Sequence, residues 1–533
     1  QNDSADYFLG GRDATWLAIG ASIFASNIGS EHLIGLAGAG ASSGMAMAHW
    51  EIQGWMILIL GWVFVPFYSR SMVYTMPEFL ERRYNPQSRT ILSVISLVSY
   101  VLTKVAVTVY AGGLVFQQVF GIKELWGIDF FWIAAIGLVV LTALYTIFGG
   151  MKSVLYTSVL QTPILLLGSL IILVLGFKEL GGWDEMMRVC GAVTVNDYGD
   201  TMTNLIRSND DANFPWLGAL IGSAIIGFWY WCTDQFIVQR VLSGKNEKEA
   251  RRGTIFGAYL KLLPVFLFLI PGMIAFALHQ KYIGAGGEGF LPMLANGTAN
   301  ADAAFPTLVA KLLPAGVKGL VVCGILAALM SSLASLFNSS AMLFTIDFYK
   351  RFRPETPEKK LVGIGQIATV VIVILGILWI PIMRSVGDVL YTYLQDVQSV
   401  LAPGIAAAFL LGICWKRTSA QGGMWGLIAG MIIGLTRLGA KVYYSNAGEV
   451  ADSTFKYLFY DMNWLFFCGW MFLFCIIVVI VVSLATEAPT AEKIQGLVFG
   501  TATKEQKAAT RASWDHWDII HTVIILAKIG RAS

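Results

Sequence analysis

The chain has 533 residues, of which 56% are hydrophobic and only 13% are charged. Soluble domains carry roughly 25% charged residues, so most of this protein's surface must face lipid rather than water. The net charge of +3 is too small to indicate a nucleic-acid partner, and the six cysteines lack the paired spacing of a disulfide framework or a metal cluster. The composition therefore predicts an all-α polytopic membrane protein, with residues 1–533 forming a single transmembrane domain.

Twelve apolar segments are long enough to cross a bilayer as helices, and a shorter thirteenth lies near the end of the chain. Lysines and arginines concentrate in alternate connecting loops, for example at Arg82 and Arg83. The positive-inside rule places these basic loops in the cytoplasm of a multi-pass cell-membrane protein, and the loops 178–215 and 280–305 outside. The expected spans are 16–40, 45–67, 91–120, 131–149, 155–177, 216–240, 254–279, 317–346, 362–383, 389–415, 422–436 and 460–484, followed by 519–530.

The first apolar segment carries polar residues around a glycine in its middle, from Ala25 to His32. Irregular backbone survives within a bilayer only where it lines a cavity or contacts protein. A span that breaks at mid-depth among polar side chains is typical of a ligand and ion site. The alternative is a glycine-rich buried helix of a soluble protein, which the composition disfavours.

The sixth segment repeats this peculiarity, because Gly222 and Gly227 precede a polar and aromatic run from Trp229 to Gln235. Two unusual spans that lie five apart predict a five-plus-five inverted repeat with broken first and sixth helices. The first repeat is expected at about 16–177, the second at about 216–415, and additional spans at about 418–530. Prolines predict further breaks at 264–271 and at 402–404.

Five polar residues lie deep in predicted spans: Asn27, His32, Glu51, Lys261 and Gln395. Each charge at the centre of a membrane helix costs about 2.5–3.5 kcal/mol, so such residues usually serve a function. One interpretation is that Glu51 and Lys261 form a structural ion pair. The other is that these side chains face one cavity and exchange hydrogen bonds with a polyol.

The aromatic run Trp229-Tyr230-Trp231 adds flat apolar faces to these donors and acceptors. Such a combination suits a neutral sugar, which is polar at its rim and apolar on its C–H faces. The alternative role for these rings is helix packing or an interfacial belt.

The eighth segment contains Ser331 and Ser332. Serines within spans commonly bond back to their own helix or pack small faces together. The functional alternative is a sodium site, in which these hydroxyls join carbonyls freed by the break near Ala25 and Ile28. A singly charged ion needs no acidic ligand there.

At these residues the chain resembles the sodium/solute symporter family, and within it the sodium/glucose cotransporter branch. The matching stretches are ASNIGSEHLIGLAG, TALYTIFGGMKSV, WYWCTDQFIVQR, YLKLLPVF, LAALMSSLASLFNSS and FTIDFYKRFRP. The resemblance covers nearly the whole chain and implies the leucine-transporter fold.

The resemblance also implies residue roles. Sugar contacts would come from Asn27, His32, Glu51, Lys261 and Gln395, with Trp231 beside them. Tyr230 would stack on the ring as an inner gate, and the outer gate would use Leu36, Tyr110 and Tyr391. Sodium would sit between Ala25 and Ile28 of the first span and Ala328, Ser331 and Ser332 of the eighth.

Three positions depart from the family pattern. Ser158 stands where relatives usually carry aspartate near the sodium path, and Gln398 replaces a threonine linked to a second sodium. We therefore expect one sodium ion rather than two. Gly227 stands where relatives offer an asparagine or threonine to the sugar.

The resemblance implies a secondary active transporter, not an enzyme, that moves a hexose such as glucose or galactose together with sodium by alternating access. Sodium is the only cofactor implied, the bilayer is the surrounding partner, and no oligomeric state is indicated. Two alternatives remain at this point: a sodium/myo-inositol symporter, and a glucose sensor or channel that does not accumulate its ligand.

Overall fold

The computed structural model describes residues 3–29, 31–294, 297–386, 390–446 and 451–532. Within these ranges the side chains of 102–103, 380, 382–386, 390–393, 395–396, 442, 445–446 and 531–532 are not described.

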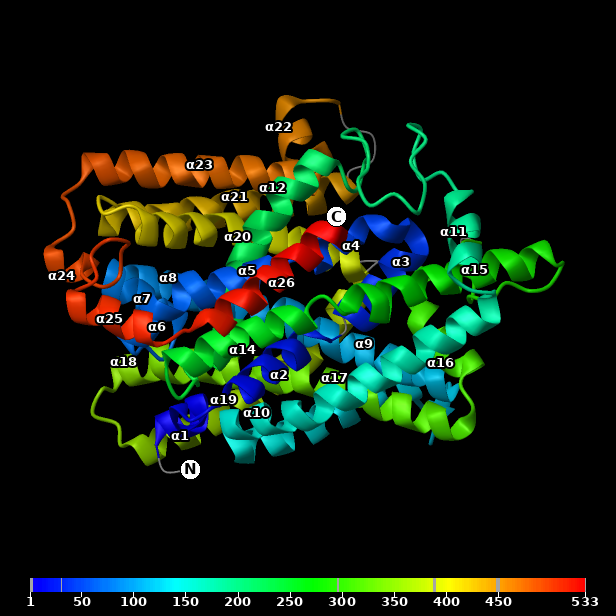
Figure 1. Ribbon diagram of the computed structural model, residues 1–533, viewed down its shortest axis with the longest axis horizontal. Helices are drawn as coiled ribbons and strands as arrows, with labels where there is room; N and C mark the ends of the chain where they lie inside the picture. Colours follow the sequence, from blue (N-terminus) through cyan, green and yellow to red (C-terminus); the bar gives the residue numbers. More distant parts are fainter. Residues whose placement is uncertain (1–2, 30, 295–296, 387–389, 447–450, 533) are drawn as a thin grey trace.

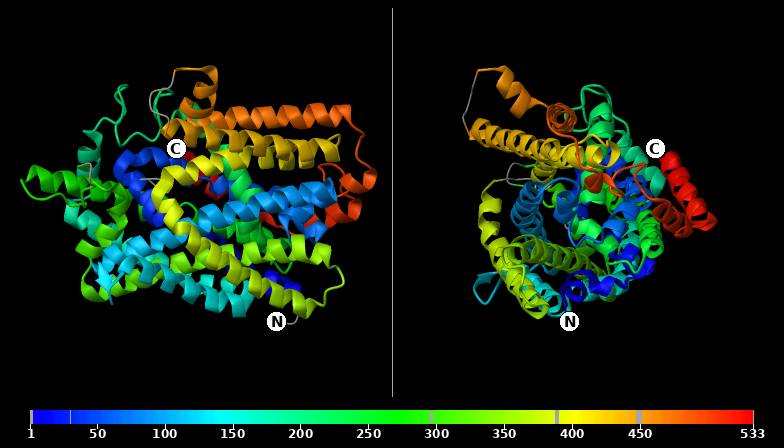
Figure 2. Two further views of the ribbon diagram at one scale, coloured as in Figure 1. Left: turned by 180° about the vertical axis from the view of Figure 1, so that it is seen from behind. Right: turned by 90° about the vertical axis from the view of Figure 1, so that its left-hand side faces the viewer.

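The long helices run roughly parallel and antiparallel to one another, along the horizontal axis of Figure 1. Viewed end-on in Figure 2, they surround a central group, with the C-terminal helix on the outside. Nine helices of the described residues are long and apolar enough to cross a membrane, and the shorter helices Trp16–Asn27 and Ala106–Phe120 are also apolar. One continuous hydrophobic core extends from Tyr7 to Ile525. The protein is thus a multi-pass helical membrane protein.

The elements follow in chain order, with 3₁₀ and π-helical turns marked η. They are α1 (Ser4–Leu9), η1 (Gly10–Arg12), α2 (Trp16–Asn27), η2 (Glu31–Leu36), α3 (Ala37–Ser43), η3 (Gly44–Met47), α4 (Ala48–Glu51), α5 (Gly54–Ile59), η4 (Leu60–Phe64), α6 (Val65–Ser71), α7 (Met76–Arg83), α8 (Pro86–Ser99), η5 (Tyr100–Val105), α9 (Ala106–Phe120), β1 (Glu124–Leu125), β2 (Ile128–Asp129), α10 (Phe130–Leu180), α11 (Trp183–Gly191), α12 (Trp216–Gly227), η6 (Phe228–Thr233), α13 (Gln235–Leu242), α14 (Glu247–Leu260), η7 (Val265–Leu269), α15 (Ile270–Gly284), η8 (Ala301–Ala303), α16 (Ala304–Leu312), α17 (Ala315–Met342), η9 (Leu343–Tyr349), α18 (Lys350–Phe352), α19 (Glu358–Val386), α20 (Leu390–Cys414), α21 (Ala420–Asn446), α22 (Thr454–Lys456), η10 (Tyr457–Asp461), α23 (Trp464–Ala485), α24 (Ala491–Ile494), α25 (Lys504–Ala512) and α26 (His516–Ala532). The two short strands pair antiparallel.

Both predicted helix breaks are confirmed. The first span stops at Asn27, since Ile28 has an extended ψ of 101°, and helix resumes at Glu31 as a π-helical turn. The sixth span changes to a π-helical turn after Gly227 and is interrupted at Asp234, which has a ψ of 128°. A helix end leaves its last carbonyls without partners from the same helix, so each break exposes backbone groups in the protein interior.

One predicted break is confirmed and another is wrong. The seventh span is interrupted between Lys261 and Pro264 and resumes as a π-helical turn. The tenth span does not break, because α20 continues through Pro403. There the adjacent Gly404 serves close packing instead, since a Cβ on it would lie 2.9 Å from the Cα of Gly430 on α21.

The expected fourth and fifth spans are two helices that join directly within the element α10. A bend occurs at Gly150, whose φ of 55° and ψ of −153° lie outside the helical region. A residue with a side chain rarely adopts such a positive φ, so glycine permits this tight change of direction without a loop. The expected loop 178–215 also contains a helix, α11.

The helices α3 and α15 approach each other closely at two glycines. A Cβ on Gly40 would lie 2.2 Å from the carbonyl oxygen of Leu269, and one on Gly272 would lie 2.0 Å from that of Ala37. Because backbone atoms cannot move aside freely, we expect Gly272→Ala to cost about 1–3 kcal/mol through overpacking. Thermal unfolding in detergent should show a lower midpoint for this variant. Gly284→Ala is the matched control, since nothing lies within 4 Å there, and equal midpoints for both variants would contradict the packing argument.

Candidate functional site

The two broken helices meet through a direct side-chain contact. Asn27, the last residue of α2, donates from Nδ2 to the hydroxyl of Tyr230 in η6 at 3.1 Å. Both side chains are buried. The polar residues at the first break therefore lie directly on the aromatic run of the sixth span.

Two predicted charges, Glu51 and Lys261, form an ion pair at the same place. Lys261 Nζ lies 2.5 Å from Glu51 Oε2 and donates to Asn27 Oδ1 at 3.2 Å. His32 Nε2 lies 3.1 Å from the same Glu51 oxygen. All four side chains are at most 7% exposed, so the cluster is sealed from bulk solvent in this structure. The pairing anticipated as one alternative is thus present, and it lies inside the polar cluster rather than at a lipid-facing surface.

Aromatic rings border this cluster. Lys261 Nζ lies 5.3 Å from the ring centroid of Trp231, and Tyr230 packs edge-on against Trp231 with centroids 4.9 Å apart. Trp229 points to a different neighbour, since its ring faces Lys104 Nζ at 5.4 Å. The site therefore combines a carboxylate, an ammonium, an imidazole and an amide with two flat apolar faces, which suits a neutral polyol.

The remaining predicted site residues are placed less completely. Leu36 is buried at the end of η2, and Tyr110 on α9 packs edge-on against Phe131. Tyr391 and Gln395 belong to α20, but their side chains lie outside the described residues.

Serines connect the first, fifth and eighth spans. Ser26 and Ser335 hydroxyls lie 2.6 Å apart, and the Ser158 and Ser331 hydroxyls lie 3.3 Å apart. A Cβ on Gly29 would lie 2.9 Å from Ser332 Oγ, so the broken backbone of the first span touches this serine. Ala25 on α2, Ile28 directly after it and Ala328 on α17 are also buried. The break in the first span therefore lies against the serines of the eighth span, forming a serine junction.

A second buried ion pair lies beneath Tyr230 and is absent from the sequence-based prediction. Lys104 Nζ donates to Asp234 Oδ2 at 2.7 Å, lies 4.7 Å from the Tyr230 ring centroid, and shares Asp234 with the Tyr100 hydroxyl. A lysine within the apolar segment 91–120 was the available signal.

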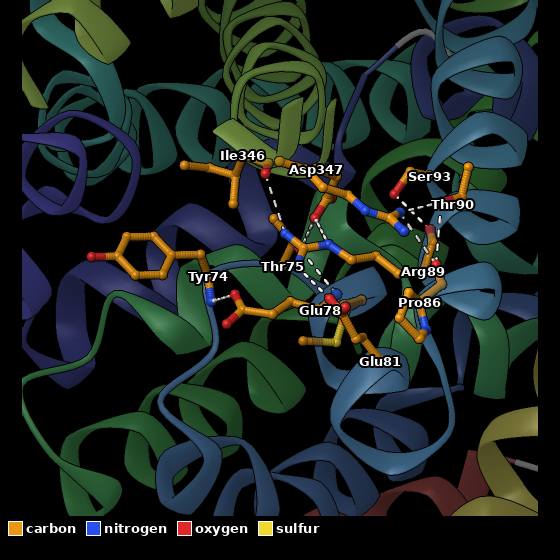
Figure 3. A network of polar contacts seen from close by, with 12 residues as sticks. Tyr74, Thr75, Glu78, Glu81, Pro86, Arg89, Thr90, Ser93, Ile346 and Asp347 are labelled. Carbon is orange, nitrogen blue, oxygen red and sulfur yellow. Dashed lines mark hydrogen bonds and ion pairs between the residues drawn. The ribbon is translucent and has the colours of Figure 1, made fainter. Parts of the chain in front are cut away.

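A third network joins the three elements α7, α8 and η9 (Figure 3). Arg89 of α8 binds Glu81 of α7 at 2.5 Å and Asp347 of η9 at 2.7 Å. Thr75, the N-cap of α7, donates to Asp347 at 2.9 Å. These contacts hold α7, α8 and η9 together.

Gln53 is another residue that the prediction missed. It is 3% exposed, and its amide Nε2 donates to the Ser223 carbonyl at 2.9 Å. Its side-chain oxygen lies 2.7 Å from the point where a Cβ on Gly227 would stand. The carboxamide thus fills the space that a side chain at position 227 would occupy.

Asp302 of η8 packs against α3. Its Oδ1 lies 2.7 Å from the position of a Cβ on Gly38, and burial raises the pKa of Asp302 from 3.8 to about 6. A raised carboxyl pKa means that the packed state binds a proton more tightly, so packing is strongest below pH 3.8 and weakens as the pH rises through 6. We expect hydrogen exchange in residues 297–305 to quicken between pH 5 and 7.5 beyond its intrinsic rate. Asp302→Asn should remove this excess, and an undiminished excess in the variant would refute the assignment.

Comparison with known proteins finds a matching family model and relatives whose names agree with it. The sodium:solute symporter family model matches residues 7–430. The human "Sodium/myo-inositol cotransporter 2" is 37% identical over 508 residues, covering 93% of this chain and 74% of that protein. The sheep "Sodium/glucose cotransporter 1" is 39% identical over 499 residues, covering 90% and 74% respectively.

Solved structures show the fold. A substrate-bound, outward-open Na⁺-coupled sialic acid symporter matches with a TM-score of 0.73 at 22% identity, covering 92% of this chain and 94% of that one. MhsT in complex with L-phenylalanine matches with a TM-score of 0.50 at 12% identity, covering 89% and 99%. The expected leucine-transporter fold, with its five-plus-five repeat and broken first and sixth spans, is confirmed.

Proposed function

Because this chain belongs to the sodium:solute symporter family, we propose that it carries a hexose such as glucose or galactose across the cell membrane together with sodium. Sodium is the co-transported ion of this family of membrane transporters. The observation that carries the choice of solute is the buried cluster of Glu51, Lys261, Asn27 and His32 beside Trp231. These groups offer donors and acceptors to hydroxyls without a net charge that would favour an ionic solute.

In this proposal the sugar inserts its hydroxyls between groups that hold one another in the structure. Glu51 accepts hydrogen bonds, Lys261 and Asn27 donate them, and Gln395 adds an amide from α20. Tyr230 lies under the ring as the inner gate and Trp231 beside it. When the sugar binds, each group replaces a hydrogen bond to another protein group with one to a sugar hydroxyl. The charged groups are already removed from water before the sugar binds, so binding does not add their desolvation cost.

Sodium binding would hold the first span and the eighth span together. The ion takes oxygen ligands from the carbonyls of Ala25, Ile28 and Ala328 and from the hydroxyls of Ser331 and Ser332. Bound there, it holds the broken first span against α17 and so orders Asn27 for the sugar. Coupling is then a shared conformational equilibrium, and it is reciprocal between the two ligands.

One ion per sugar provides a useful driving force. A potential of 100 mV contributes roughly 2.3 kcal/mol per charge. A tenfold sodium gradient adds about 1.4 kcal/mol. Their sum can hold a sugar gradient of a few hundredfold, since each 1.4 kcal/mol is a factor of about ten.

The same proposal assigns the gates and the orientation of the protein in the membrane. Leu36, Tyr110 and Tyr391 form the outer gate, and the Arg89 network lies at the cytoplasmic end with the basic loops. Residues 1–533 act as one transport domain with repeats at about 16–177 and 216–415 and further spans at about 418–530.

Myo-inositol is the second candidate solute, because it presents a ring of hydroxyls to the same groups. One of the relatives is also named a sodium/myo-inositol cotransporter. Purified protein in liposomes under an inward sodium gradient should take up radiolabelled glucose, with competition by glucose, galactose and myo-inositol compared directly. Stronger competition by myo-inositol than by either hexose would transfer the assignment to the cyclitol. Sugar binding without any uptake would favour a sensor.

A further inference from the structure

The inner half of the sixth span, α13, buries a guanidinium next to the serine junction. Arg240 is fully buried, and its Nε donates to Ser26 Oγ at 3.2 Å. Its Nη1 donates to the Phe236 carbonyl of its own helix, while its Nη2 has no hydrogen-bond partner among the described residues. This side chain thus retains a buried, incompletely satisfied positive charge.

Other fully buried arginines have their charge offset. Arg251 pairs with Glu247 at 2.8 Å, and Arg437 donates to the Met462 carbonyl at the end of η10. Carbonyls at a helix C-terminus carry partial negative charge, which favours a cation. Arg83 binds in the same way to carbonyls near the end of α20.

Arg240 forms no direct ion pair with a described residue, and its charge is offset only indirectly. It lies in the last turn of α13, where the helix C-terminus favours a cation, its guanidinium lies 5.2 Å from the Phe236 ring centroid, and Asp234 attracts it at longer range. Among the ion pairs formed by described residues, none includes it. Asp234, six residues earlier, is already held by Lys104. Ser158, beside Ser331, supplies a hydroxyl rather than a carboxylate. A buried charge without a direct ion pair is costly, so its presence at this position indicates a function.

A chain of hydrogen bonds leads from this charge to the proposed sodium residues. Ser26 Oγ, which accepts from Arg240, lies 2.6 Å from Ser335 Oγ. Ser335 donates in turn to the Ser331 carbonyl at 2.7 Å. The guanidinium therefore lies within three hydrogen bonds of the eighth-span serines.

We propose that the charge of Arg240 sets a low sodium affinity and bars cations from passing the junction without sugar. The inference rests on the proposed sodium site. Repulsion from the guanidinium opposes cation occupancy, so the ion dissociates readily once the inner side opens. Arg240 acts through this field and through Ser26, as a positioning residue rather than a ligand.

Neutralisation should therefore tighten sodium binding. We expect Arg240→Met to lower the sodium concentration for half-maximal uptake about tenfold, the order of effect of a unit charge roughly 10 Å away at an effective dielectric constant near 20. Sugar-free sodium leak into liposomes, followed with ²²Na⁺, should rise. Arg240→Lys, which keeps the charge, should match the wild type in both measurements. A structural role alone would instead reduce transporter yield or raise the half-maximal sodium concentration, and either a raised or an unchanged value in Arg240→Met overturns the proposal.

Ser26→Asp covers the case in which Arg240→Met does not fold, because it keeps the arginine and gives it a carboxylate partner. It should also lower the half-maximal sodium concentration, and a raised or unchanged value overturns the proposal. Absence of any sodium dependence in the wild type would instead remove the proposed function. Sodium dependence in the wild type together with a raised value in the variants would remove only the role of Arg240.

Discussion

The double variant Glu51→Gln with Lys261→Met should fold and reach the membrane yet transport no sugar. Each single change leaves a buried charge without its partner, which costs about 3–5 kcal/mol. The double change removes both charges and that penalty. Stability should therefore recover in the double variant, while uptake should stay lost because the ammonium donor at 261 and the charged acceptor at 51 are gone. Thermal unfolding and sugar uptake, measured on the same preparations, separate the two effects.

This comparison decides between the two interpretations of the pair. If Glu51 and Lys261 serve only as a structural ion pair, the double variant regains uptake along with stability. Gly284→Ala, at an open position outside the proposed sugar site, serves as a folding and uptake control. Restored uptake in the double variant would remove both residues from the sugar site.

Removing the two hydroxyls of Ser331 and Ser332 should raise the sodium concentration for half-maximal uptake by tenfold or more. A hydrogen bond or dipole contact with a charged group contributes about 1.5–3 kcal/mol, so loss of even one ligand has at least this effect. The maximal rate at saturating sodium should change less, because the sugar contacts remain. Uptake measured across a sodium series with the Ser331→Ala, Ser332→Ala double variant tests this.

Ser483→Ala is a suitable control for that series, because this buried serine lies on α23, outside the junction. It should leave the sodium dependence unaltered. A double variant of Ser331 and Ser332 with wild-type sodium dependence would show that the ion binds elsewhere.

Much of the architecture can be predicted from the sequence, because polar residues and glycines stand out in segments that are otherwise apolar. Asn27, Glu51 and Lys261 are polar residues in segments that must otherwise face lipid or apolar protein, so a common meeting place is expected. The break at Ile28 follows from polar residues and glycine at mid-span. The structure brings these side chains together at 2.5–3.2 Å.

Other contacts depend on packing that local patterns do not encode. Lys104 and Asp234 lie 130 positions apart, and Arg89 and Asp347 lie 258 apart. Their pairing requires knowledge of which helices adjoin. The continuous helix at Pro403 likewise reflects the tight fit of Gly404 against α21, which outweighs the local tendency of proline to interrupt a helix.

The position of Gln53 is a further feature that the sequence alone does not predict. Its side chain lies where a side chain at Gly227 would stand, and although Gly227 departs from the family pattern, no local pattern links it to Gln53. Only the three-dimensional arrangement shows that one side chain fills the space left by the other.

Sugar accumulation by the purified protein in liposomes tests most directly whether sodium and sugar share the two broken helices. With an inward sodium gradient and an inside-negative potential, the internal concentration of free glucose should exceed the external one. It should fall back to equality when sodium is equal on both sides and the potential is removed. Equilibration to the same level under both conditions would contradict coupled transport.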